Sequence, residues 1–175
     1  IDEHTKAYVG PLTPGIFQKL PETLEHIYTA FPDGKIRREN IEIGGKTADE
    51  LIAELEGAGI KISEDAKHML KSPEFVAGKT KEAGTFIRLT VADLGFAQGA
   101  TTEQIYAHAE ELGLELCPPD TGPNYRTHYK NQPLGEWVYV GMKPITARDG
   151  DPRVFYAEHG GDGLWLDDDW AEPGS

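Results

Sequence analysis

The chain has a single cysteine, Cys117, among its 175 residues, and it has no long hydrophobic run. One cysteine excludes an intrachain disulfide and favours a reducing compartment, so we expect a cytoplasmic protein. No apolar stretch approaches the roughly 20 residues that a transmembrane helix requires. The start of the chain also lacks the pattern of a signal peptide. We therefore expect a soluble protein that does not cross a membrane.

Basic residues are scarce, with 17 Lys and Arg against 30 Asp and Glu and a formal net charge of -13. Direct nucleic-acid binding is not expected, because it normally requires a basic face that releases counterions. The one local basic cluster (Lys35, Arg37 and Arg38) adjoins Glu39 and Glu42. An acidic protein could instead mimic nucleic acid and block a DNA-binding protein, if its carboxylates were spaced along one long face.

Familiar catalytic and cofactor-binding motifs are absent as well. The sequence contains no P-loop, no dinucleotide-binding glycine fingerprint, no nucleophile-elbow serine, no paired-cysteine zinc site and no His-Glu-x-x-His. We therefore expect no cofactor. The absence of these motifs favours a binding or accessory protein over an enzyme.

Short helices are predicted in the first half of the chain. Apolar residues at helical spacing indicate a helix over residues 21–31, and a short strand or loop follows over residues 35–43. Thr47 and Glu50 have the spacing of a capping box, which predicts that a helix begins there. Another helix is expected after Ser63.

Strands are predicted in the second half, around one further helix. A strand begins at Phe86, a helix is capped by Thr101 or Thr102, and an extended segment starts at Leu114. Three more strands, separated by turn sequences, predict an antiparallel meander: Trp137–Met142, Val154–Glu158 and Leu164–Leu166. The predicted class is α+β: N-terminal short helices, then a mixed or antiparallel sheet with one packed helix and a C-terminal β-meander.

We divide the chain into a helical part (residues 1–76), an exposed connection (77–85) and an α+β part (86–175), which together form one compact domain. The chain begins at Ile1 rather than Met and ends in the loop-like Ala171–Ser175, which indicates a fragment of a longer protein.

Over half of the chain resembles hypothetical proteins from bacterial genomes. The resemblance is carried by these stretches: Gly59–Phe75, Arg88–Phe96, Glu110–Pro118, Gly135–Trp137 and Met142–Ile145. It implies a bacterial source and a further strand beyond the end of this chain. The family has no established activity, so the resemblance implies no catalytic or binding residue.

The first candidate site lies in the proline-bounded segment 118–133, which we expect to be a loop. An arginine flanked by tyrosines can clamp a carboxylate or phosphate between apolar walls. Tyr125, Arg126 and Tyr129, with Trp137 on the following strand, are therefore candidate ligand-binding residues. In the alternative interpretation the tyrosines pack on the sheet and Arg126 pairs with a nearby acid.

The second candidate is catalytic. Cys117 with His128 or His159 could form a thiolate–imidazole pair, although a single cysteine at the end of a strand is also an ordinary buried hydrophobe. Either histidine, held by a carboxylate, could instead serve a small hydrolase or transferase.

The third candidate is the run Asp167, Asp168 and Asp169, because clustered carboxylates suit calcium or magnesium. Its spacing matches no calcium loop, and a solvated acidic end is the alternative. Our leading hypothesis is a non-enzymatic protein of the bacterial cytoplasm that recognises another protein or a small anionic ligand. The hydrolase or transferase and the nucleic-acid mimic stay open as alternatives.

Overall fold

The computed structural model describes residues 6–11, 37–90, 95–96, 98–111 and 113–171. In these residues a mixed eight-stranded sheet is combined with four helices, so the predicted α+β class is confirmed. The predicted helix over residues 21–31 lies outside the described residues.

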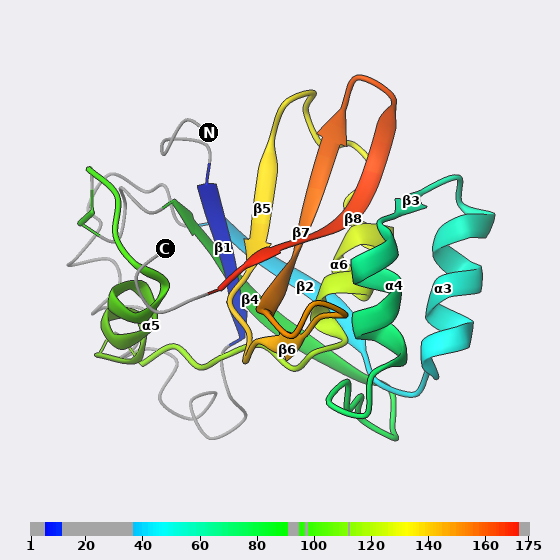
Figure 1. Ribbon diagram of the computed structural model, residues 1–175. Coiled ribbons are helices and arrows are strands. Elements are labelled where there is room, and N and C mark those ends of the chain that lie inside the picture. Colours follow the sequence, from blue (N-terminus) through cyan, green and yellow to red (C-terminus); the bar gives the residue numbers. More distant parts are fainter. Residues whose placement is uncertain (1–5, 12–36, 91–94, 97, 112, 172–175) are drawn as a thin grey trace.

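The sheet draws its strands from both halves of the chain (Figure 1). The strands are β1 (Lys6–Pro11), β2 (Arg37–Ile43), β3 (Lys61–Ile62), β4 (Glu82–Thr90), β5 (Trp137–Val140), β6 (Ile145–Thr146), β7 (Pro152–Gly160) and β8 (Gly163–Trp170). Their order is β2-β4-β1-β5-β7-β8-β3, with β6 paired to β7. Two pairs, β1 with β5 and β3 with β8, are parallel, and the other pairs are antiparallel. Strands from the first 76 residues therefore belong to the same sheet as those that follow.

The C-terminal strands β5, β7 and β8 pair antiparallel in chain order. Gly160 pairs with Gly163, which leaves a two-residue turn between β7 and β8. The turn expected near residue 150 joins the short β6 to β7, since Ile145 pairs with Arg153. The connection from β5 to β7 is therefore longer than a simple hairpin.

The four helices are α3 (Ala48–Gly57), α4 (Glu64–Lys71), α5 (Thr102–Glu111) and α6 (Thr121–His128). The capping box of α3 is present, since the Thr47 side chain accepts from the Glu50 amide at 3.2 Å and the Glu50 carboxylate accepts from the Thr47 amide at 2.8 Å. Ser63 caps α4 at the predicted start, where its hydroxyl accepts from the Ala66 amide at 3.1 Å. Thr101 caps α5 through the amide of Gln104.

Helix α6 corrects the prediction of a loop over residues 118–133. Its single proline, Pro123, lies in the first turn, where a backbone N–H has no intrahelical partner and proline is tolerated. The turn-forming residues around it therefore did not exclude a helix. The predicted extended segment at Leu114 is also wrong, because only an isolated bridge from Cys117 to Met142 forms there. Strand β4 begins at Glu82, inside the segment expected to be a connection.

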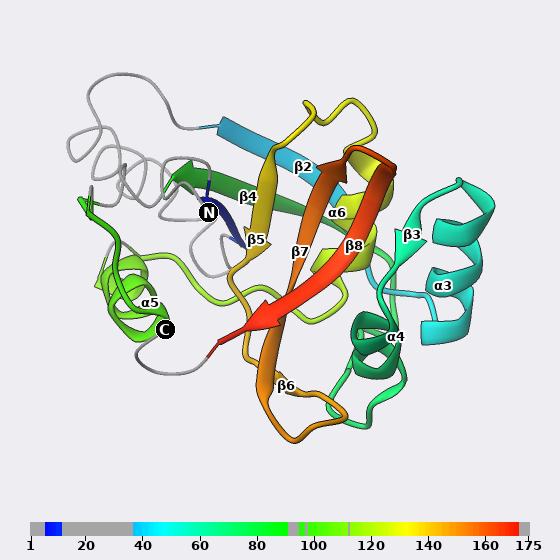
Figure 2. The ribbon, with the colours of Figure 1, turned by 45° about the horizontal axis from the view of Figure 1, so that its top comes forward.

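Helix α6 packs directly on the sheet, and α3 and α4 lie beside it near β3 and β8 (Figures 1 and 2). Gly122 allows the close approach of α6, because a Cβ there would lie 2.9 Å from the Cβ of Phe155 on β7. Helix α5 lies at the opposite end of the molecule from α3. Its Tyr106 hydroxyl donates to the Met142 carbonyl at 2.9 Å. No helix in the described part is long and apolar enough to cross a membrane.

Candidate functional site

Two glycines after β2 bring three distant segments together. Gly44 and Gly45 both have positive φ, at 80° and 75°, which favours glycine. The Gly44 amide donates to the buried carboxylate of Asp120, at the start of α6, at 2.7 Å. A Cβ at Gly45 would lie only 3.1 Å from the backbone nitrogen of Lys81. This junction therefore fixes the start of β4 and the entry to α3 beside α6.

Burial raises the pKa of Asp120, and the amide of Gly44 partly offsets this effect. The carboxylate is 1% exposed, and its Oδ1 has no hydrogen-bond partner among the described residues. Asp120 thus holds the junction through one oxygen and keeps the other oxygen desolvated.

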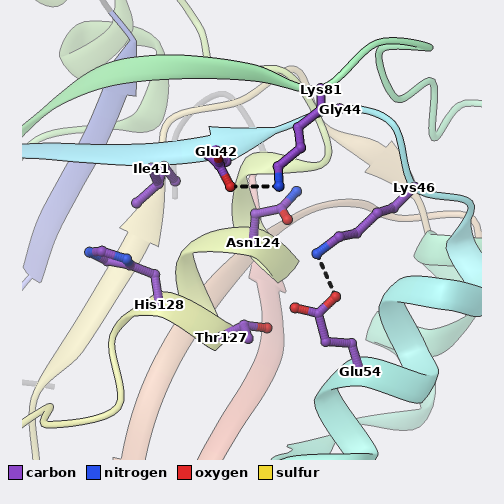
Figure 3. A pocket seen from close by; sticks show the side chains of 9 residues that line it. All are labelled: Ile41, Glu42, Gly44, Lys46, Glu54, Lys81, Asn124, Thr127 and His128. Atoms are coloured by element: carbon purple, nitrogen blue, oxygen red, sulfur yellow. Dashed lines mark hydrogen bonds and ion pairs between the residues drawn. The ribbon is translucent and has the colours of Figure 1, made fainter.

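A polar pocket of about 170 Å³ lies next to this junction, between β2, α3 and α6 (Figure 3). It is lined by Ile41, Glu42, Gly44, Lys46, Glu54, Lys81, Asn124, Thr127 and His128. An engineered cavity of about 150 Å³ can hold benzene, so this pocket has room for a group of roughly six heavy atoms. Because the pocket is open on one side, a larger molecule could insert one end.

Two ion pairs cross the pocket wall. The ammonium of Lys81 lies 2.9 Å from the Glu42 carboxylate, and that of Lys46 lies 2.5 Å from Glu54. The hydrogen bond and the charge of Glu42 raise the pKa of Lys81, so this lysine stays charged at neutral pH. In the view of Figure 3 the side chain of Asn124 lies between the two pairs.

The remaining wall comes from one face of α6. Asn124, Thr127 and His128 have the spacing i, i+3 and i+4, which places them on the same side of a helix. Of these three, the sequence singled out only His128, and for catalysis. Recognition of the helical period in segment 118–133 would have grouped all three residues. Lys46 and Lys81 carried no local signal, since only the fold brings them to α6.

Arg126 lies on the opposite, buried face of α6 and is 0% exposed. Its guanidinium donates to the Gln132 side chain at 2.5 Å, to the Glu158 carbonyl at 3.1 Å and to the carbonyls of Trp165 and Tyr129. Burial lowers its pKa to about 10. Arg126 therefore ties α6 to β7 and β8 and offers no fork to a ligand from solvent. The prediction that Arg126 is an accessible clamp for a ligand is therefore wrong, because the side chain is buried. The alternative interpretation expected an ion pair with a nearby acid, whereas the partners of Arg126 are neutral acceptors.

The two tyrosines that flank Arg126 are also buried. Tyr125 and Tyr129 are 0% and 4% exposed, and their rings are 5.5 Å apart. The Tyr129 hydroxyl donates to Glu136 at 2.7 Å, and Glu136 forms an ion pair with Arg88 at 2.7 Å. Sequence reasoning missed this half-buried pair because Arg88 lies on a distant strand.

Trp137 belongs to a different cluster from Arg126. Its ring stacks on that of Tyr156 at 4.9 Å, and Tyr139 stacks on the same tyrosine at 5.1 Å. The four predicted ligand-binding residues therefore do not line one cavity in the described structure.

The catalytic candidates are also separated by their contacts. Cys117 is 4% exposed, and burial raises the pKa of its thiol, which disfavours the nucleophilic thiolate. Nδ1 of His159 lies 2.6 Å from the Gln132 carbonyl, so that nitrogen carries a proton and donates. His128 is exposed on the pocket wall. Among the interactions of the described residues, neither histidine is held by a carboxylate.

The three aspartates of β8 have separate partners. Asp168 accepts from Arg153 at 2.7 Å and from Ser63 at 2.6 Å, whereas Asp169 accepts from the Tyr139 hydroxyl at 2.6 Å. Consecutive residues of a strand point to opposite faces, so Asp168 points away from the face that Asp167 and Asp169 share. Within the described ranges no three histidine, cysteine or carboxylate side chains are grouped to hold a metal ion.

No protein-family model, curated protein or solved structure matches the chain. The resemblance to bacterial hypothetical proteins therefore stays a prediction. The pocket between β2, α3 and α6 is the candidate functional site, since it alone among the sites considered above combines accessible charged groups with a cavity.

Proposed function

We propose that this chain is a non-enzymatic binding protein of the bacterial cytoplasm that takes a small ligand in the pocket between β2, α3 and α6. The ligand carries an anionic group that bonds to Lys46 and Lys81. One observation carries the proposal: two lysines from separate connecting segments, before α3 and before β4, direct their ammonium groups into the same pocket (Figure 3).

The lysines are suited to an anion because an ammonium has three donors, and each lysine forms an ion pair with one carboxylate. An anionic oxygen can therefore share the lysines with Glu54 and Glu42 or replace them. The amide of Asn124 and the imidazole of His128 offer further polar contacts at the wall. The junction at Gly44 keeps the two lysine-bearing segments together before the ligand arrives, which reduces the entropy lost on binding.

The test is a titration of the isotope-labelled protein followed by its backbone amide chemical shifts. The probes are inorganic phosphate, succinate and β-alanine, each of which has an anionic group. We expect at least one probe to shift the amides of Asn124, Thr127 and His128 in a saturable way. Lys46→Gln or Lys81→Gln should weaken that probe by about threefold to tenfold, because each variant removes one charge-assisted contact at a partly solvent-screened site.

The matched control is Lys67→Gln. Lys67 on α4 pairs at 2.6 Å with Glu56 on α3, the helix that also carries Glu54, but Lys67 does not line the pocket. This variant should bind the probe as the wild type does. Saturable shifts that map away from the pocket, or equal affinity in all three lysine variants, would contradict the proposal. The same holds if no probe produces a saturable shift.

The two alternative functions have less support. A hydrolase or transferase needs a histidine held by a carboxylate, whereas His159 is held by a backbone carbonyl. A nucleic-acid mimic needs unpaired carboxylates along one face, whereas several carboxylates, including Glu136 and Asp168, are paired with arginines.

A further inference from the structure

The charges that line the pocket cancel one another. Two lysines, Lys46 and Lys81, face two glutamates, Glu54 and Glu42, in direct ion pairs. Two positive and two negative side chains therefore sum to no net charge on this part of the wall. The wall therefore presents both positive and negative groups to a ligand, rather than charges of one sign.

A purely anionic ligand fits this wall poorly. If it took a lysine from Glu54 or Glu42, the released carboxylate would stay beside the incoming negative charge, and like charges at short range repel. The whole chain carries a formal net charge of -13, which also disfavours the approach of an anion.

A ligand with both charges avoids these costs. Its carboxylate can bond to a lysine while its ammonium bonds to the glutamate that the lysine releases, so the number of ion pairs does not fall. Resting on the function proposed above, we infer that the pocket recognises an amino-acid-like zwitterion, with the carboxylate at Lys46 and Lys81 and the ammonium at Glu42 or Glu54. The volume of about 170 Å³ fits the charged end of such a molecule.

Three probes of one carbon skeleton test this inference: β-alanine has both charges, propionate lacks the ammonium, and propylamine lacks the carboxylate. Dissociation constants are measured from the amide shifts of Asn124 and Thr127. We expect β-alanine to bind about tenfold more tightly than either of the other two probes, since each lacks one charge-assisted contact.

Glutamate variants separate the inference from the function on which it rests. In the double variant Glu42→Gln/Glu54→Gln the preference for β-alanine over propionate should disappear, while propionate should bind no more weakly than before. Glu56→Gln is the control, because Glu56 pairs with Lys67 outside the pocket. If propionate binds the wild type as tightly as β-alanine, the zwitterion inference falls and the anion site remains. If neither binds at the pocket, the inference falls, and the proposed function falls too unless another anionic probe binds there.

Discussion

Replacement of Arg126 should cost a large part of the stability of this fold. The side chain is fully buried and donates to Gln132, Glu158, Trp165 and Tyr129, which belong to the end of α6, the segment before β5, and strands β7 and β8. These contacts make the arginine the main polar link between α6 and the sheet.

The magnitude follows from two opposing effects. In Arg126→Ala the buried acceptors on Gln132, Tyr129 and Glu158 lose their donor, and each orphaned acceptor costs roughly 1–3 kcal/mol. The variant also removes a charge that burial disfavours. The pKa of about 10 indicates that this charge costs the native state roughly 3 kcal/mol. The three orphaned acceptors together outweigh the released charge, and we expect a net loss of about 3 kcal/mol, the middle of the range that these two effects allow.

The assay is equilibrium unfolding in urea at neutral pH, followed by circular dichroism and tryptophan fluorescence. Arg148→Ala is the control, since Arg148 is exposed and solvent screens its ion pair with Asp65 at 2.9 Å, which should therefore contribute little to stability. A loss at Arg126 no greater than the loss at Arg148 would refute the reasoning about the buried network.

Three further predictions concern single buried groups. Burial raises the pKa of Asp120, so the contribution of this side chain to stability is present below its unfolded pKa and is lost as pH rises. The unfolding free energy of the wild type minus that of Asp120→Asn should therefore decrease from about pH 4 upward. A flat or rising difference would contradict this. Cys117 should react with a thiol reagent only as fast as the protein opens, whereas immediate labelling of the native protein would show an accessible thiolate. Gly122→Ala should destabilise the protein by about 1–3 kcal/mol, because the new Cβ would lie 2.9 Å from Phe155, despite the better helix propensity of alanine. Gly57→Ala, which meets no atom within 4 Å, should be neutral or stabilising in the same urea experiment.

Elements with local signals were predictable from the sequence. The capping residues Thr47 and Ser63 mark their helices because the cap satisfies backbone donors within a few residues. The turn at Gly160–Gly163 is similarly local, since glycines there permit a tight reversal. Helix α6 was missed because its turn-forming residues outweighed the i, i+4 spacing of Tyr125 and Tyr129, which was the available helical signal.

Features that depend on distant pairing were not predictable. The parallel contact of β1 with β5 joins residues more than 120 positions apart, and no local pattern specifies its register. The pocket has the same character, because Lys46, Lys81 and Asn124 meet only after β2, β4 and α6 have assembled. Arg126 was predicted to bind a ligand from its residue type and its neighbours in the sequence alone. In the structure its side chain instead holds α6 to the sheet.

The most direct test of the central claim is to locate a bound zwitterion by intermolecular nuclear Overhauser effects. The methylene protons of β-alanine should show contacts to the methyl groups of Ile41 and Thr127, which line the pocket. These contacts should disappear in the double variant Lys46→Gln/Lys81→Gln. Contacts only to residues elsewhere on the protein, or contacts that persist unchanged in the double variant, would contradict the assignment of this pocket as the ligand site.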